Sequence, residues 1–343
     1  MAYCREKLVM SKNISCKYVE RFEIPAFKTH NATPPFNHSM VSGSECELCA
    51  VKIVGNSNAP CIYVGGGTHG DEINGTAAVL RLIDEIAPEG LNGSLILVPV
   101  QNPLAFKYRC RMNPYDPIDL DWVGLGRPSG AYTRNLKNIL CKLIQGSDCV
   151  IDLHTAGHGG FNNTLVFVPP ETGDGAGKES LRLSVVFGGD EIVQGENLDV
   201  YGWPVHYALP FIAARERKSG IYAESGGGGA VLPDTRSVDY FVTGVLNVMK
   251  SLGMIAGSVV GQGRRDVINS AEAVSLSVKS PCEGVFFPEV NVGKAVENGE
   301  CLGKVYGIPS GVHDIRAVES GYISWRCGFG SIARGEKLFS LSR

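Results

Sequence analysis

The chain has 343 residues, which is long enough for two domains and a sizeable hydrophobic core. Its formal net charge of -3 gives no electrostatic reason to expect nucleic acid or an anionic membrane as the partner. No apolar run approaches the ~20 residues that span a bilayer, and the first residues lack the apolar core of a signal peptide. We therefore expect a cytoplasmic protein.

The cysteines agree with a reducing compartment. The chain contains 11 of them, and Cys61, Cys141 and Cys149 lie inside apolar runs, where a reduced thiol packs as a small hydrophobic side chain. Cys46 and Cys49 are the only pair with metal-ligand spacing. Strand-like alternation continues through this pair without a second pair nearby, so we favour a structural role for both.

Hydrophobic periodicity predicts strands that alternate with helices. Residues 1–45 are poorly patterned and predict one or two strands and a loop. After them, in chain order, we expect a strand at 47–54, a strand at 61–64, a helix at 73–87, a strand at 94–100, a helix at 132–144, strands at 149–153 and 164–168, helices at 178–187 and 207–218, a strand at 221–223 and a helix at 235–252. This alternation predicts an α/β fold, with a mainly parallel or mixed sheet covered by helices on both faces.

Two further segments do not fit this alternation. Residues 103–130 read as a long loop rich in proline, aspartate and arginine, and a loop of that length in a compact domain is usually functional. After about residue 262 the chain has frequent glycine turns and short alternating strands. Two similar halves, at 280–305 and 316–341, share a Gly-Glu-x-Leu ending. We expect a catalytic domain over 1–262 and a small all-β barrel-sandwich domain over 263–343.

Polar residues follow three of the expected strands. His69 and Glu72 lie in a glycine-rich turn between a strand and a helix, His154 ends another strand, and Glu224 ends a third. Strand ends at the carboxyl edge of such a sheet are the usual ligand site. Two ligands close in sequence and one remote ligand form a three-ligand zinc site with a position for water. Glu224 could then accept the proton of that water, and Asp152 could fix the tautomer of His154.

Four segments in the same order resemble the succinylglutamate desuccinylase/aspartoacylase family: GGGTHGDEINGT at 65–76, QNPLAFKYRCR at 101–111, DLHTAG at 152–157 and ESGGGG at 224–229. Members of that family are zinc amidohydrolases related to the carboxypeptidase A fold. The C-terminal segment resembles the lipoyl-like β-domain of a bacterial subset, which includes deacetylases of N-acetyl-diaminobutyrate. It lacks the Met-Lys-Met hairpin of a lipoyl or biotin carrier.

The resemblance implies roles for individual residues. It implies one Zn²⁺ per chain held by His69, Glu72 and His154, with Glu224 as the acid-base residue. The family's arginine that polarises the scissile carbonyl falls on Arg111, with Arg109 as the second choice. A guanidinium suits that role because it stays charged and offers a fixed fork of donors.

The chain departs from the family pattern at one point. In many relatives the two residues after Asp-Leu are Asn-Arg, which bind a substrate carboxylate. In this chain the two residues after Asp119-Leu120 are Asp121-Trp122. We expect Asp121, Trp122 and Asn102 to contact the substrate, with Asp121 and Trp122 favouring an ammonium group. The alternative is that another cation, such as Arg127, Arg134 or Arg215, replaces the missing arginine.

The function expected from these features is zinc-dependent hydrolysis of an amide bond, which deacylates a small N-acyl amine or N-acyl amino-acid derivative. A metallocarboxypeptidase is the alternative within enzymes. A small-molecule binding protein without turnover is the alternative in another class. We expect no nucleic acid or membrane partner, and the sequence leaves a homo-oligomer open.

Overall fold

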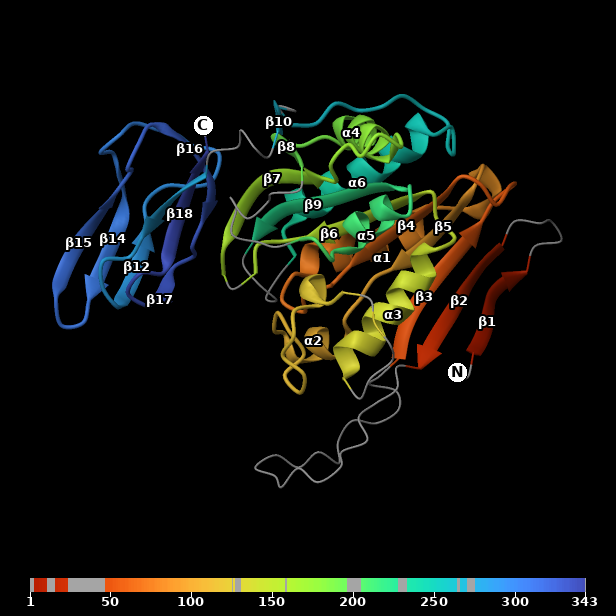
Figure 1. The fold of residues 1–343 in the computed structure, drawn as a ribbon, viewed down its shortest axis with the longest axis horizontal. Coiled ribbons are helices and arrows are strands. Elements are labelled where there is room, and N and C mark those ends of the chain that lie inside the picture. Colours follow the sequence, from red (N-terminus) through yellow and green to blue (C-terminus); the bar gives the residue numbers. More distant parts are fainter. Residues whose placement is uncertain are drawn as a thin grey trace, which may run out of the picture.

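A mixed β-sheet with helices on both faces forms the larger part of the molecule, as the sequence predicts (Figure 1). The computed structural model describes residues 3–10, 16–23, 47–124, 126, 131–157, 159–195, 205–227, 233–263, 266–269 and 275–342. The strands of this part are β1 (Tyr3–Met10), β2 (Cys16–Glu23), β3 (Glu47–Val54), β4 (Cys61–Gly66), β5 (Ser94–Val98), β6 (Cys149–His154), β7 (Phe161–Val168), β8 (Glu191–Gln194), β9 (Ser219–Gly227) and β10 (Asp266–Asn269).

The centre of the sheet is parallel and fully buried. Its order is β5-β4-β6-β9, with each neighbouring pair parallel, and all side chains of β4, β5 and β6 are buried. Strands buried on both faces read as continuous apolar runs, which is the pattern of their sequences. Antiparallel strands flank this centre, β1-β2-β3 beside β5 and β7 beside β9. All four central strands therefore end at the same edge of the sheet.

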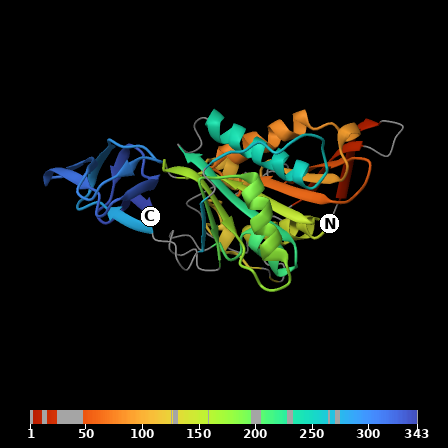
Figure 2. The ribbon, with the colours of Figure 1, turned by 90° about the horizontal axis from the view of Figure 1, so that it is seen from above.

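Helices pack on both faces of this sheet (Figure 2). They are α1 (Ile73–Glu85), α2 (Pro103–Tyr108), α3 (Tyr132–Ile144), α4 (Ala176–Phe187), α5 (Leu209–Arg215) and α6 (Thr235–Ser251), with short 3₁₀ turns η3 (Pro88–Gly90) and η4 (Leu120–Trp122). The apolar sides of α1, α4 and α6 share one core with the sheet, and those of α3 and α5 share another. No helix among the described residues is long and apolar enough to cross a membrane.

The C-terminal segment is all β within the described residues, as expected. Its strands are β11 (Ser275–Lys279), β12 (Gly284–Pro288), β13 (Ala295–Val296), β14 (Cys301–Gly307), β15 (Gly311–Arg316), β16 (Gly321–Arg326), β17 (Gly330–Ile332) and β18 (Lys337–Ser342). They enclose a separate core that includes Phe286 and Phe339. The short strand of each sequence half pairs with the other half, β13 with β16 and β17 with β12. The two sequence repeats thus exchange strands.

This β segment connects directly to the larger sheet. Strand β16 pairs antiparallel with β7, with Trp325 opposite Asn162 and Arg326 opposite Phe161. Both views place the segment beside β7, at the opposite end of the sheet from β1 (Figures 1 and 2). A division of the chain at residue 262 remains a prediction.

Several sequence-based boundaries need correction. The expected loop 103–130 contains α2 and η4, because Pro103 and the Asn102 cap start a helix that the periodicity is too short to reveal. The helix expected at 207–218 shrinks to α5, and the strand expected at 221–223 extends to the nine residues of β9. Cys46 lies outside the described residues, and Cys49 is a free thiol.

Candidate active site

The turn after β4 positions the first two candidate ligands. Gly67 has φ of +65°, a left-handed conformation that glycine adopts without strain. Gly70 lies so close to α2 that an added Cβ would be 1.9 Å from the carbonyl carbon of Ala105. The turn therefore has room only for glycine at both points. It brings His69 and Glu72, both almost fully buried, beneath the ends of the central strands.

Glu72 occupies the N-cap position of α1, yet its side chain makes no cap hydrogen bond. An N-cap carboxylate ordinarily accepts from the first free N–H groups of its helix. Here it turns instead toward the two histidines. The Glu72 carboxylate therefore contacts the histidines of the site and does not cap the helix.

His154 and Glu224 enter from neighbouring strands. His154 is the last residue of β6, and Glu224 lies directly opposite it on the parallel strand β9. Because paired residues of adjacent strands point to the same face, both side chains reach the same edge as His69 and Glu72. All four residues are at most 4% exposed. The structure therefore brings the four residues together.

Glu72 bridges the Nδ1 atoms of the two imidazoles. Its Oε1 lies 2.8 Å from Nδ1 of His69 and its Oε2 lies 3.0 Å from Nδ1 of His154. The Nδ1 atom of His69 has no hydrogen-bond partner despite this short distance. A buried imidazole nitrogen without a hydrogen-bond partner, beside a carboxylate and a second imidazole, fits the donor set of a zinc site.

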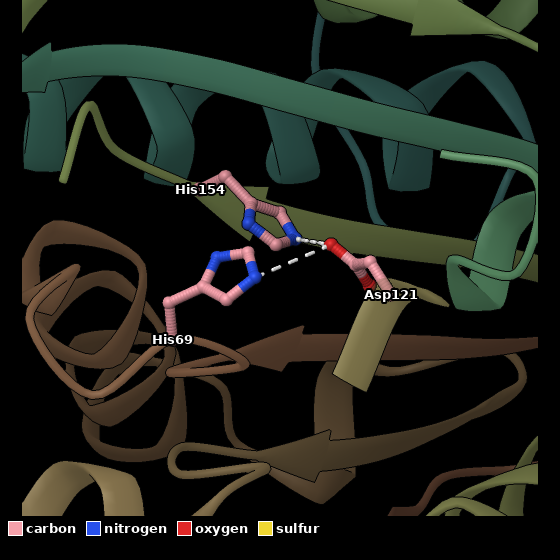
Figure 3. Close-up of side chains that lie close together, drawn as sticks. All are labelled: His69, Asp121 and His154. Carbon is pink, nitrogen blue, oxygen red and sulfur yellow. Dashed lines mark ion pairs between the residues drawn. The ribbon is translucent and has the colours of Figure 1, made fainter. Parts of the chain in front are cut away.

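Carboxylates also face the Nε2 atoms of the same histidines. The Oδ2 of Asp121 lies 3.6 Å from Nε2 of His69 and 4.0 Å from Nε2 of His154 (Figure 3). His69, Asp121 and His154 form a buried group that could also hold a metal ion. The histidine pair therefore lies between two carboxylates, Glu72 on one side and Asp121 on the other.

Two further aspartates on the Nε2 side are well placed to orient the imidazoles. Asp119 Oδ1 is 3.1 Å from Nε2 of His69, and Asp152 Oδ2 is 3.4 Å from Nε2 of His154. An imidazole that binds a metal through one nitrogen usually donates its other N–H to a carboxylate. With a metal on the Nδ1 side, each histidine would have such a partner. This arrangement agrees with the ligand set that the family resemblance implies.

Charges around the histidines are strongly coupled. Burial and the charge of Arg111 lower the pKa of His69, but the carboxylates of Glu72 and Asp119 outweigh them and raise it to about 9. Burial opposes ionisation of Glu72, yet the two imidazoles hold its pKa well below the usual range. Carboxylates and protonated imidazoles therefore balance one another's charge in this network.

Glu224 differs from the other carboxylates. Burial, together with the nearby charge of Glu72, raises the pKa of Glu224 to about 7. Its Oε2 accepts a hydrogen bond from the Nδ2 amide of Asn162 on β7. A carboxyl group with a pKa near neutrality can both accept and return a proton. Glu224 therefore has the electrostatic properties of a general acid-base residue.

Arg111 and Arg109, the two candidates for the arginine that polarises the carbonyl, lie in different places. The Nε of Arg111 donates to Asp119 at 2.9 Å, and its Nη1 donates to Glu72 at 3.1 Å. Arg109 follows α2 with φ of 53°, and its side chain is exposed. Of the two, Arg111 is the arginine beside the histidines.

The three residues expected to contact the substrate differ in their exposure and their contacts. Asp121 is 2% exposed, whereas Trp122 is 53% exposed, so the two neighbours do not share one environment. The Asn102 side chain caps α2 by accepting from the N–H of Ala105 at 3.3 Å. Its buried Nδ2 has no hydrogen-bond partner.

Sequence reasoning missed three residues of the site, namely Asn162, Asp119 and Tyr222, whose ring stacks on the imidazole of His154. The sequence pattern does not indicate Asn162, because the register between β7 and β9 determines its contact with Glu224. Asp119 stands two residues before Asp121, and that spacing of carboxylates could have identified it. His158, another residue near the turn after β6, lies outside the described part of the chain.

Comparisons with known proteins place this chain beside a family of deacylases. Residues 58–176 match the model of the succinylglutamate desuccinylase/aspartoacylase catalytic domain. The chain is 26% identical over 299 residues to an N-alpha-acetyl-L-2,4-diaminobutyric acid deacetylase of Halomonas elongata, and the match covers 85% of this chain and 84% of the relative.

Solved structures share the fold. A succinylglutamate desuccinylase/aspartoacylase from Rhodobacter sphaeroides superposes with a TM-score of 0.73 at 23% identity, over 87% of this chain and 89% of that one. The product-bound ectoine utilization protein EutE of Ruegeria pomeroyi gives a TM-score of 0.78 at 19% identity, with 98% of each chain covered.

Proposed function

We propose that the chain, whose residues 58–176 match the catalytic domain of the succinylglutamate desuccinylase/aspartoacylase family, is a zinc-dependent amidohydrolase that deacylates a small N-acyl amine or amino-acid derivative. His69, Glu72 and His154 would hold one zinc ion. Glu224 would act as the acid-base residue, and Arg111 would stabilise charge on the carbonyl oxygen. The cluster of two buried imidazoles that face one carboxylate, with Glu224 on the adjacent strand, is the observation that carries this proposal.

The residues of the chain suit each step of amide hydrolysis. A bound zinc ion polarises the substrate carbonyl and lowers the pKa of water. Glu224 accepts a proton from the attacking water and later returns it to the leaving amine, for which a pKa of about 7 is suited. The Arg111 guanidinium, held by Glu72 and Asp119, offers a fixed positive charge to the oxygen that gains negative charge.

The curated relative supports the choice of substrate class. That protein is named for the removal of an acetyl group from an N-acetylated diamino acid, and it aligns with most of this chain. A metallocarboxypeptidase is less well supported, because Asp121 and Trp122 stand where the family's carboxylate-binding pair is expected. The enzymes named in the comparisons cleave amide bonds that lie outside peptides.

Metal removal and restoration test the proposal. The protein would be stripped with a chelator, reloaded with one equivalent of zinc, and assayed for free amine released from N-acetyl-diaminobutyrate, N-acetyl-aspartate and succinylglutamate. We expect zinc-dependent release from at least one compound, and loss of release in Glu224→Gln with zinc retained. A zinc-loaded protein that binds these compounds without cleaving any would support the binding-protein alternative.

A further inference from the structure

The all-β C-terminal segment meets the catalytic sheet at Asn162, whose side-chain amide donates to the carboxylate of Glu224. Trp325 of β16 lies directly opposite Asn162 of β7 in an antiparallel pair. Side chains that are directly opposite in such a pair point to the same face and contact each other. The indole of Trp325 is therefore a cross-strand neighbour of the amide that contacts Glu224.

The second cross-strand partner of Asn162 has no side chain. On the β9 side, Asn162 pairs with Gly226, and Glu224 lies two residues before this glycine. A residue two positions along the partner strand is a diagonal neighbour, which a side chain can reach. Of the two residues that pair with Asn162, only Trp325 therefore offers a side chain that can pack against its amide.

Hydrogen bonds fix only one end of this amide. The Nδ2 of Asn162 donates to Glu224, whereas its Oδ1 is buried and has no hydrogen-bond partner among the described residues. The terminal torsion of an asparagine side chain has broad energy minima, so one hydrogen bond does not hold the amide in one orientation. Packing against a neighbour has to supply the remaining constraint. Trp325 is in position to supply it.

The indole of Trp325 is itself held by close contacts. A Cβ added to Gly160, in the turn after β6, would be 2.8 Å from Nε1 and 2.9 Å from Cζ2 of the indole. Gly160 in turn lies against β9, because a Cβ added to Gly227 would be 1.8 Å from the carbonyl oxygen of Gly160. The Nζ of Lys337 on β18 lies 4.5 Å from the centroid of the Trp325 ring. The ring is thus fixed between the two parts of the molecule.

The neighbouring residues of β16 fit the catalytic part equally closely. The guanidinium carbon of Arg326 lies 4.2 Å from the centroid of the Phe161 ring, and a Cβ added to Gly328 would be 2.3 Å from the carbonyl oxygen of Gly159. Burial lowers the pKa of Lys337, and the negative charge of Glu224 opposes this effect. The C-terminal segment therefore lies within electrostatic range of the acid-base residue.

We infer that Trp325 is a positioning residue, whose indole keeps the Asn162 amide on the carboxylate of Glu224. This inference rests on the proposed deacylase function and deepens it. Trp325 lies outside residues 58–176, which match the catalytic-domain model, so the β segment adds a part to the catalytic machinery. Loss of the indole should lower kcat and leave zinc content and KM close to their wild-type values, because the proposed ligands and the substrate pocket keep their residues.

A double-mutant cycle tests whether Trp325 acts through Asn162. With zinc-loaded full-length protein and N-acetyl-diaminobutyrate, Trp325→Ala should lower kcat by about tenfold and change KM by less than about threefold. In the Asn162→Ala background the same substitution should change kcat by less than about threefold, since two residues that act as one unit are not additive. Equal losses of kcat in the two backgrounds would overturn the inference.

Two further variants separate positioning from general damage to the β segment. Trp325→Phe keeps an aromatic ring against the amide, so its kcat should stay within about threefold of the wild-type value. Phe329→Ala is the matched control, because this ring is 67% exposed and contacts Phe287 of the same β segment, with centroids 4.6 Å apart. A loss of kcat in Phe329→Ala as large as in Trp325→Ala would contradict a specific role. If Trp325→Ala does not fold, Trp325→Leu takes its place in the cycle.

A measurement without substrate separates this inference from the proposed function. If the wild-type protein cleaves none of the test compounds, the deacylase proposal fails, but the contact can still be followed by nuclear magnetic resonance. The side-chain amide signals of Asn162, identified by their loss in Asn162→Ala, should shift when Glu224→Gln is introduced. With Trp325→Ala present, that shift should shrink by about half or more. A shift that keeps its full size, or no shift in either background, would overturn the inference.

Discussion

The imidazole of His154 stacks face to face on the phenol ring of Tyr222, with ring centroids 4.0 Å apart and planes inclined by 14°. Tyr222 lies on β9, the strand that pairs with β6, and its hydroxyl donates to Asp121 at 3.3 Å. The stack fixes the plane of the imidazole without using either ring nitrogen. Tyr222 therefore orients His154 and leaves both nitrogens available, one for a metal and one for a carboxylate.

Two substitutions of Tyr222 separate the stack from the hydroxyl. Tyr222→Phe keeps the ring and should change zinc affinity by less than about threefold. Tyr222→Leu removes the flat surface, so the imidazole gains freedom and zinc affinity should fall by roughly tenfold or more, as for other groups that orient metal ligands. Competition with a chromophoric chelator measures both. Equal affinities in the two variants would show that the stack does not orient the ligand.

Asp152 should support zinc binding through His154. Its Oδ2 lies 3.4 Å from Nε2 of the imidazole, and its Oδ1 accepts hydrogen bonds from Thr68 and Gln101. Asp152→Asn keeps the size of the side chain but weakens its acceptor, so zinc affinity should fall by about ten- to a hundredfold. Unchanged affinity, measured by the same competition, would remove Asp152 from this role.

Asn162 should hold Glu224 in position. Its amide donates to the Glu224 carboxylate, and charge-assisted hydrogen bonds contribute about 1.5–3 kcal/mol. Asn162→Ala should therefore lower kcat/KM by about tenfold or more while zinc content stays at the wild-type level. Asn163→Ala, at the next position on β7, is the control. A loss of zinc in Asn162→Ala would point instead to damage of the sheet.

The pH dependence of kcat/KM should report Glu224. Burial and the charge of Glu72 raise its pKa to about 7 in the metal-free protein, and a nearby cation favours the ionised form and lowers it. Because the base must be ionised, activity should rise with pH through a limb at or below about pH 7. In Asn162→Ala the ionised form loses a hydrogen bond, so the limb should move to higher pH. A limb that moves to lower pH would contradict the assignment.

Zinc binding to the metal-free protein should release protons. The carboxylates of Glu72 and Asp119 outweigh burial and the Arg111 charge and raise the pKa of His69 to about 9, so its imidazole is largely protonated at neutral pH. A metal ligand must lose that proton. Calorimetric titrations at pH 7.5 in two buffers of different ionisation enthalpy should give different apparent enthalpies, and identical values would contradict the expectation.

The sequence predicts the helices and strands in which apolar residues recur with a regular period. The boundaries of β3 and α3 agree with the expected ranges, because apolar spacing and flanking turns define both ends. Helix α2 was missed because its six residues are too few to show a period, and its start depends on the cap of Asn102. The length of β9 follows from its pairing with β6 and β7, which is a tertiary effect.

Some residues of the candidate site can likewise be predicted from the sequence, and others cannot. His69, Glu72, His154 and Glu224 could be selected from sequence because each follows a recognisable strand. Asn162 could not, since strand register alone brings it to Glu224. Residues that act by pairing across elements require the structure.

The zinc content of two variants shows which carboxylate holds the metal together with the two histidines. Glu72 and Asp121 lie on opposite sides of the histidine pair, and the proposed zinc site lies on the side of Glu72. Zinc per chain would be measured by mass spectrometry after dialysis for wild type, Glu72→Ala and Asp121→Asn. We predict about one zinc per chain in wild type and Asp121→Asn, and loss of zinc in Glu72→Ala. Stoichiometric zinc in Glu72→Ala, together with its loss in Asp121→Asn, would place the metal on the side of Asp121 instead.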